Sequence, residues 1–425
     1  MEVGGALSRS PERLAWTVLL ASFLSCCALA VGVPSIAWSF VNNATVPPIM
    51  TVKLQAGRTT AFTPPETEAD ARVVSQDGRQ LEEGSTVIVD DDSQSQALIT
   101  IIAGEGSEPL ATLQLYSGAR VTLERARLPR FESISNQPAV FVIYLQSGRM
   151  QVLNQFGDAR VGMEVRTGLA VTRLGGGSYS FEQSPDETQI AAREGRAAVT
   201  AIDPPGGLML QPEQRTAVTQ EGGLQGILPA YRDLIQNGHF EPPLEPAWTT
   251  YAEVAAGGEV TGTVTTVGEP PDTSLLLDRF GTGLSWGRTG VQQELNESVA
   301  GRRSLQLRVQ FTILYQELPV CGGLGSECPL MLTLTYLDSN GSERQWTQGF
   351  YADGVPSAAL PDEIVTAPQP HNKHVAVRLG VRETYESEDL LGAPGDIQAV
   401  KSIRIYAEGH GVRTQVYLAE LLVLD

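Results

Sequence analysis

One apolar stretch near the N-terminus is long enough to span a membrane, and it limits the topology that the rest of the chain can have. Residues 14–33 carry no charge, and twenty helical residues span roughly the 30 Å hydrocarbon core of a bilayer. Trp16 lies near the start of this stretch, and Trp38 and Phe40 follow its end, where aromatic rings favour the membrane interfaces. The sequence therefore predicts a transmembrane anchor over residues 14–40.

The charges that flank the anchor predict its orientation. Arg9 and Arg13 precede the apolar stretch, so the positive-inside rule places residues 1–13 in the cytoplasm. Nearly the whole chain, from about residue 41 onward, then lies outside the membrane. We expect a single-pass protein of the cell membrane whose bulk is extracytoplasmic.

Two alternatives to an intact anchor stay open. The tripeptide Ala-Leu-Ala at 28–30 has the small-x-small form of a signal-peptidase site, and cleavage after Ala30 would release the rest of the chain. The tetrapeptide Leu-Ser-Cys-Cys at 24–27 is similar to a lipoprotein box, which would place a lipid on Cys27. Against cleavage, the sequence remains apolar through 36–38, whereas mature N-termini usually turn polar at once.

Composition narrows the class of protein. A net charge of −19 and a pI near 4.7 oppose any general attraction to nucleic acid or to an anionic membrane surface, so no nucleic-acid partner is expected. The length of 425 residues suits about two ordinary domains beyond the anchor. Two cysteines lie in the anchor, and Cys321 and Cys328 lie in the glycine-rich loop CGGLGSEC. In an oxidising compartment we expect these two to form a disulfide.

The region after the anchor has the pattern of β-structure. Residues 41–72 are expected to form a membrane-proximal connector with one potential strand, Thr51–Gln55, and no core. From Val73 onward, short runs of alternating apolar residues end in turn dipeptides such as Ser117-Gly118 and Ser147-Gly148. This alternation predicts strands with one buried face and one solvent-exposed face.

These runs carry a resemblance to a known family. The segments DGRQLEEGSTVIVDDDSQSQALITI, LQLYSGARVTLERARL and MEVRTGLAVTRLGGGSYSFEQSPDETQIAAREGRAAVTAI resemble the extracytoplasmic FecR-type domain, over residues 73–222. The resemblance implies a bacterial source and a β module of stacked hairpins, which in signalling members passes an outer signal to a sigma-factor regulator. Here only residues 1–13 remain inside, too few to hold a sigma factor. We therefore expect the module to act as a spacer or protein-contact surface.

A second β domain is predicted over residues 234–425. A glycine-rich break precedes it, residues 223–233 form the expected linker, and residues 227–234 could form two turns of helix. Apolar residues alternate strictly over Leu305–Ile313 and over Val375–Val381. At least eight antiparallel strands without a helical period favour a β-sandwich of the jelly-roll type.

The ends of this domain carry a second resemblance. The opening NGHFE at 237–241, with Trp248 and the closing VYLAE at 416–420, is similar to the galactose-binding-like jelly rolls that include many carbohydrate-binding modules. In that family an acidic residue at the opening and another in the last strand often hold a structural calcium. Glu241 and Glu420 are the matching positions, although Ala419 stands where a second acidic residue is common. A structural calcium is the one cofactor the resemblance implies.

Aromatic residues of this domain are candidates for contact with a sugar, because their rings offer flat apolar faces. Trp286 and Arg288 lie in the glycine-rich loop GTGLSWGRTG, and Trp346 and Tyr351 form a second group. Each ring could instead belong to the core. We expect a neutral glycan to bind at Trp286 and Arg288.

Catalysis finds little support in the sequence. It contains no glycine-rich phosphate loop, and His371 and His374 are interpreted as surface residues. The sequence thus predicts a membrane-anchored, all-β, non-catalytic binding or scaffold protein, with a glycan or a cell-envelope protein as partner. A sigma-factor regulator and, more remotely, a carbohydrate-active enzyme are the alternatives. The sequence does not identify the ligand.

Overall fold

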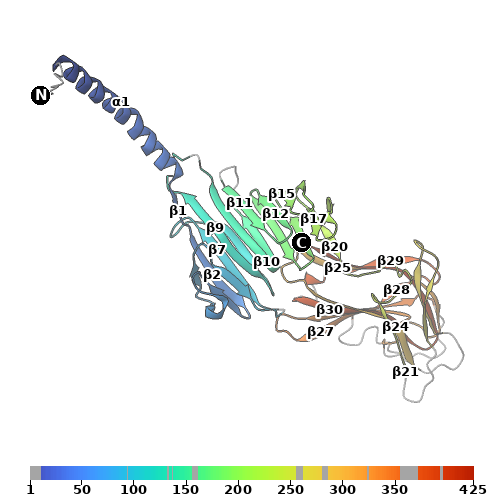
Figure 1. Ribbon diagram of the computed structural model, residues 1–425. Coiled ribbons are helices and arrows are strands. Elements are labelled where there is room, and N and C mark those ends of the chain that lie inside the picture. The colour runs from blue at the N-terminus through green and yellow to red at the C-terminus, as the bar shows by residue number, and fades with distance from the viewer. Residues whose placement is uncertain are drawn as a thin grey trace, which may run out of the picture.

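The structure of the protein is a computed structural model that describes residues 11–92, 94–131, 134–135, 137–155, 161–254, 262–279, 286–322, 325–354, 372–392 and 396–425. Over this part of the chain one α-helix, α1 (Pro11–Asn43), is followed by strands that build two β domains (Figure 1). The first domain contains β1 to β19 and the second contains β20 to β31. The prediction of an all-β protein with an N-terminal apolar helix and a β-sandwich is confirmed.

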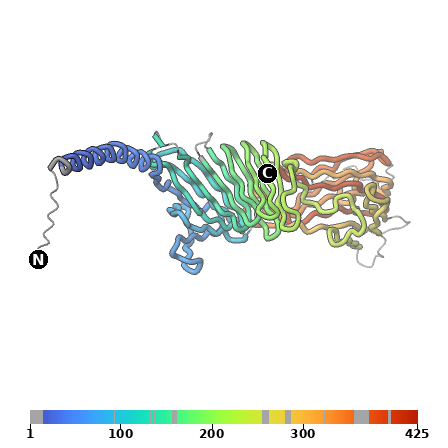
Figure 2. The backbone as a smooth tube through the Cα atoms, turned by 45° about the horizontal axis from the view of Figure 1, so that its top comes forward, coloured from blue at the N-terminus to red at the C-terminus, as the bar shows by residue number. Residues whose placement is uncertain are grey.

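Helix α1 is long and apolar enough to span a membrane. Its residues Ala15–Asn43 have a mean hydropathy of 2.1 over the most apolar window, and none of that window is buried against the rest of the protein. The helix projects from the far end of the first domain (Figure 2). Pro34 lies inside it, so the helix continues beyond the uncharged stretch.

The first domain is a closed, hydrogen-bonded β structure in which the chain passes repeatedly between two sheets. The long strand β10 joins them, because its first half pairs with β9 and β11 and its second half with β8 and β13. The strands are β1 (Thr45–Val46), β2 (Ile49–Ala56), β3 (Thr59–Phe62), β4 (Arg72–Val73), β5 (Arg79–Leu81), β6 (Thr86–Val89), β7 (Gln96–Ile102), β8 (Pro109–Leu115), β9 (Arg120–Pro129), β10 (Ala139–Asn154), β11 (Val161–Arg166), β12 (Ala170–Leu174), β13 (Gly177–Gln183), β14 (Glu187–Ala192), β15 (Ala197–Ala201), β16 (Gly206–Leu210), β17 (Gln214–Thr219), β18 (Gly223–Leu224) and β19 (Leu228–Pro229), with a 3-10 turn η1 at Glu68–Asp70.

The first domain begins earlier than the sequence predicts. Residues 41–72 are not a connector without a core, because β2 pairs with both β5 and β7. Met50, Val52 and Ala61 are buried in the same apolar cluster as the later strands. Strand β2 pairs with distant parts of the chain, such as Ile49 with Ile102, so its place in the core depends on partners that its own pattern does not reveal.

The second domain is a sandwich of two six-stranded sheets. The β24 sheet has the order β21-β24-β30-β26-β27-β28, and the β25 sheet has the order β22-β23-β31-β25-β29 with β20 on β31. The strands are β20 (Tyr231–Asp233), β21 (Thr249–Val254), β22 (Thr263–Val267), β23 (Ser274–Arg279), β24 (Gly287–Ser298), β25 (Ser304–Gln316), β26 (Leu330–Leu337), β27 (Glu343–Ala352), β28 (Val375–Val377), β29 (Glu383–Glu386), β30 (Ala399–Gly409) and β31 (Val412–Leu424).

The sandwich encloses an aromatic core. Trp248, Phe311 and Phe350 are fully buried in it, and the indole N–H of Trp248 donates to the carbonyl of Asn237 at 3.0 Å. The segment between the domains is not helical. Strand β19 pairs with β17 and β20 pairs with β31, so the segment passes from one domain to the other as strand.

The two domains meet end to end at a charged junction (Figure 2). The side chain of Arg302 is only 2% exposed; it pairs with Glu182 of β13 at 2.7 Å and with Asp425. Burial alone would raise the pKa of Glu182, but Arg302, Arg232 and Arg149 outweigh it and hold that pKa below its usual value. These ion pairs are largely shielded from solvent, and they connect the segment just before β25 and the last residue of the chain to β13 of the first domain.

Candidate functional site

The outer face of the β24 sheet carries a polar site of the second domain. Strand alternation sends every second residue of β24 and β30 into the core and the others to the opposite face. The outward residues are matched by register: Arg288 lies opposite Glu408, Gly290 opposite Tyr406, and Gln292 opposite Arg404. On the other side of β24, Tyr251 lies opposite Gly290 and Glu253 opposite Arg288.

A groove of about 270 Å³ runs over this face. Strand β21 forms one wall and β24 the floor, and β30 contributes the far side. Its lining combines hydroxyl, amide, carboxylate and guanidinium groups, from Thr249, Tyr251, Glu253, Gln292, Glu294 and Arg404. Such a mixture suits a ligand with many hydroxyls, since it offers donors and acceptors side by side.

Tyr251 is the unusual residue of the groove. Its hydroxyl oxygen is buried and has no hydrogen-bond partner among the described residues. Burial raises the pKa of Tyr251 well above its usual value, so the hydroxyl keeps its proton and remains a donor. A buried hydroxyl without a partner costs about 1–3 kcal/mol, so a functional explanation is needed for keeping it.

Trp286 and Arg288 come together at one end of the groove. The Arg288 guanidinium pairs with the carboxylate of Glu408 at 2.9 Å and with that of Glu253 at 3.3 Å. The indole N–H of Trp286 donates to Glu408 at 3.2 Å. The Arg288 Cζ also lies 5.8 Å from the Trp286 ring centroid and 5.0 Å from that of Tyr406. Burial raises the pKa of Glu408, while Arg288 lowers it in part.

The sequence predicts that Trp286 is an exposed ring in a flexible loop. In the structure, neighbouring residues partly bury its side chain and hold it in place. Trp286 is half-buried, and Arg288 is already part of β24. Glu408 holds both side chains in place. The two predicted contact residues are thus neighbours at a fixed position; whether they bind sugar stays a prediction.

The second predicted aromatic group does not lie on this surface. Trp346 is 6% exposed and packs in the sandwich core, because its position opposite Leu334 puts it on the inward face of β27. It has no free ring face to offer, so its assignment as a sugar contact is wrong. Tyr351 points the other way and packs, partly buried, against the apolar cluster around the disulfide.

Cys321 and Cys328 form a disulfide with an S–S distance of 2.01 Å. Both are fully buried and belong to a small apolar cluster with Met331 and Tyr406, against which Tyr251 packs. The disulfide loop therefore supports the same face that carries the groove. This connection between the loop and the site is not visible in the sequence.

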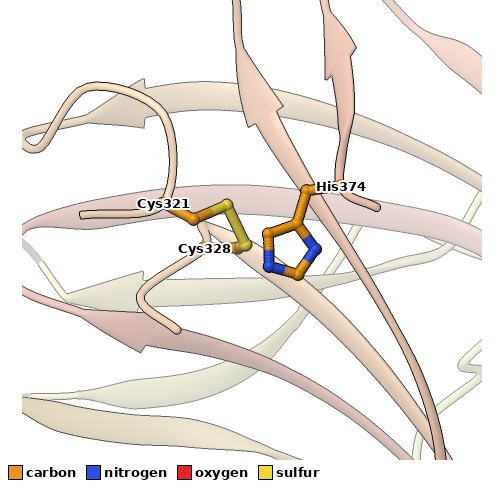
Figure 3. A group of neighbouring side chains, drawn as sticks. All are labelled: Cys321, Cys328 and His374. Atoms are coloured by element: carbon orange, nitrogen blue, oxygen red, sulfur yellow. A yellow bond between two sulfur atoms is a disulfide. The ribbon is translucent and has the colours of Figure 1, made fainter. Parts of the chain in front are cut away.

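His374 lies beside the disulfide (Figure 3). It is 4% exposed, so its assignment as a surface residue is wrong; its Nδ1 accepts a hydrogen bond from the Gly349 N–H at 3.2 Å, and its Nε2 contacts the Gly325 carbonyl. Burial lowers the pKa of His374 and favours the neutral ring. Because the two sulfurs are bonded to each other, the group offers no thiolate pair to a metal. His371 lies outside the described residues.

The predicted calcium residues are not gathered into a ligand set. Glu241 is exposed, and Glu420 faces Arg308 at 3.5 Å. Among the residues the structure describes, neither belongs to a group of three metal-ligating side chains. The structural calcium stays a prediction that rests on the resemblance alone.

Comparison with known proteins gives a limited result. No protein-family model matches the chain, and no curated protein matches it. Similar solved structures include a putative anti-sigma factor from Parabacteroides distasonis, at 19% identity and a TM-score of 0.24, covering 34% of this chain and 57% of that one. The family 11 carbohydrate-binding module of the Clostridium thermocellum cellulase Lic26A-Cel5E has 11% identity and a TM-score of 0.23, covering 41% and 86%.

A third similar structure is TmCBM61 in complex with β-1,4-galactotriose, with 12% identity and a TM-score of 0.24, covering 46% of this chain and 99% of that one. The chain thus spans little more than half of the anti-sigma factor. All three TM-scores lie below 0.5, so these similarities do not establish a shared function.

Proposed function

We propose that this protein is a non-catalytic, membrane-anchored binding protein whose second domain binds a glycan in the groove of the β24 sheet. The observation that carries the proposal is the buried hydroxyl of Tyr251, which has no partner among the described residues. A sugar hydroxyl or ring oxygen in the groove would accept its hydrogen bond when the Tyr251 side chain turns to bring the hydroxyl to the surface of the groove. The cost of the unpaired donor in the free protein would then be recovered on binding.

The remaining groups of the groove suit the same ligand. Gln292 and Thr249 supply neutral donors and acceptors. Trp286 is not part of the lining but is connected through Glu408 and Arg288 to Glu253 of the groove, so its ring lies beside the site. Sugar rings stack on aromatic faces through their C–H groups, and polar neighbours select the hydroxyl pattern. The Glu408 carboxylate fixes the Trp286 ring before any ligand arrives, which reduces the entropy lost on binding.

The rest of the molecule would position this groove. In the proposal α1 anchors the chain, with residues 1–13 in the cytoplasm and both β domains outside. The first domain then acts as a spacer, since it separates α1 from the second domain (Figures 1 and 2). The buried ion pairs of Arg302 would keep the spacer and the binding domain in one orientation.

A binding screen tests the proposal. The full chain in detergent is titrated against a panel of plant, fungal and bacterial polysaccharides, with Trp286→Ala as the variant. We expect the wild type to bind at least one glycan and Trp286→Ala to weaken that binding by about 1–3 kcal/mol. Absence of binding across the panel, or binding that Trp286→Ala leaves unchanged, contradicts the assignment.

A further inference from the structure

Two donors of the groove, the Tyr251 hydroxyl and the Arg404 guanidinium, have no hydrogen-bond partner among the described residues. Glu253 is paired with Arg288 at 3.3 Å, and the Glu294 carboxylate accepts a hydrogen bond from the side-chain amide of Gln292. Both carboxylates of the lining are therefore engaged. Tyr251 adds a hydroxyl that has no acceptor among the described residues.

Arg404 is the second free donor. Its guanidinium makes no ion pair or hydrogen bond with any described residue; its Cζ lies 5.8 Å from the Tyr406 ring centroid, and its charge acts on Tyr251 and Tyr406. Other arginines of the domain behave differently. Arg288 pairs with two carboxylates, and Arg308 pairs with Glu386 and Glu420. An unpaired guanidinium in a groove stands apart from this pattern.

The two free donors lie on the same face and near each other. Tyr251 is opposite Gly290, and Arg404 is opposite Gln292, two residues farther along the same strand. They lie on the two strands that flank β24, whose axes are roughly 10 Å apart, a spacing that a sugar ring lying across β24 can bridge. The positive charge of Arg404 acts on the Tyr251 hydroxyl. Both line the same groove.

We infer that the groove takes a glycan with a hexuronate residue, whose carboxylate binds the Arg404 guanidinium while the Tyr251 hydroxyl donates to the same group or to the neighbouring ring oxygen. This inference rests on the proposed function and replaces the neutral ligand expected from the sequence. A guanidinium binds a carboxylate through two parallel hydrogen bonds, which neutral hydroxyls do not match in strength.

The overall charge sets a limit on the ligand. At a net charge of −19, and with Glu253 and Glu294 in the lining, the protein repels a chain that carries a carboxylate on every residue. A single uronate within an otherwise neutral oligosaccharide avoids most of this repulsion. We therefore assign the site to isolated uronate residues and not to polyuronates.

The test compares matched pairs of ligands. Trisaccharides with one glucuronate, galacturonate or mannuronate residue are titrated calorimetrically into the full chain in detergent, each beside its neutral methyl ester. The variants are Arg404→Gln, which removes the charge, and Arg404→Lys, which keeps the charge but loses the planar fork. Arg382→Gln is the control, because Arg382 also lies over a tyrosine ring, Tyr417 at 4.0 Å, away from the groove.

We expect at least one acid to bind about tenfold more tightly than its ester, Arg404→Gln to abolish that preference, and Arg404→Lys to keep part of it. Arg382→Gln should behave as wild type, and all variants should keep the wild-type thermal midpoint. Equal affinity for acid and ester, or a preference that survives in Arg404→Gln, overturns the inference but leaves the proposed function standing. Failure of the wild type to bind any sugar, neutral or acidic, overturns both.

Discussion

The two β domains share a construction principle but differ in what they present to solvent. In the first domain, several outward arginines pair with glutamates, as Arg166 does with Glu164 of the same strand at 2.7 Å and with Glu124 at 3.1 Å. Arg149 is an exception, because its guanidinium has no hydrogen-bond partner among the described residues and lies over the Tyr116 ring at 4.0 Å. In the second domain, the outward face of the β24 sheet leaves Tyr251 and Arg404 without such partners. Arg149 is only 4% exposed and is covered by the protein, whereas Tyr251 and Arg404 line a groove that a ligand can enter. Under the proposed function, this difference gives support to the first domain and recognition to the second.

The largest expected effect comes from a core substitution in one domain, and it tests whether the two cores unfold independently. Trp248→Ala removes a fully buried indole and its hydrogen bond to Asn237, and should lower the free energy of unfolding of the second domain by about 3–5 kcal/mol. Thermal unfolding followed by calorimetry should show the second-domain transition shifted and the first-domain transition kept. A matched change in the first domain, Phe181→Ala, should do the reverse. If either variant shifts both transitions equally, the domains do not form separate cores.

Removal of the disulfide should have a somewhat smaller effect, again confined to the second domain. Replacing Cys321 and Cys328 together by alanine opens a loop with a sequence separation of 7. Loop-closure entropy for so short a loop predicts a loss of about 2–3 kcal/mol. Because Tyr251 and Tyr406 pack against the disulfide cluster, glycan affinity should fall as well. Lower stability with unchanged affinity would show that the loop does not support the groove.

The junction gives a third, smaller effect that concerns the two domains together. Glu182→Gln removes the negative charge that pairs with Arg302 and Arg232. We expect the variant to lower the free energy of unfolding by about 2 kcal/mol. Loss of a fully buried partner would cost about 3–5 kcal/mol, but 30% of the Glu182 side chain is exposed. Small-angle scattering of the variant should show a wider range of domain orientations. An unchanged scattering profile would mean that other contacts fix the domains.

The pH dependence of the junction follows from the same residue. The pKa of Glu182 is lowered in the folded protein, so the unfolded state binds more protons between the two pKa values. The contribution of Glu182 is thus present above the unfolded pKa and is lost as pH falls through the folded pKa. The coupling between the domains should weaken on acidification in wild type and change less in Glu182→Gln.

Some of this architecture follows from the sequence because alternation is a local property. The period of two in Leu305–Ile313 places those side chains in the core without knowledge of the partner strands. The glycine-rich break near residue 222 likewise falls close to the observed passage between domains. Trp286 and Arg288 are close in sequence, so their proximity in the site is unavoidable.

The groove could not be predicted because it depends on pairing between distant strands. Tyr251 and Arg404 are about 150 residues apart and meet only through the register of β21, β24 and β30. The orientation of the Trp346 side chain toward the core depends in the same way on its pairing with Leu334. The sequence of each strand shows which residues alternate. The whole sandwich determines which of the two faces is buried and which strand pairs with it.

Tyr251→Phe tests the central claim most directly, because it deletes one oxygen atom and leaves the ring in place. Two quantities are measured on the full chain: the thermal midpoint and the affinity for the glycan that the wild type binds most tightly. Since the hydroxyl has no partner in the free protein, the midpoint should stay the same or rise, while the affinity should fall about tenfold. A lower midpoint with unchanged affinity would show that the hydroxyl serves the fold, and the groove would lose its assignment as the binding site.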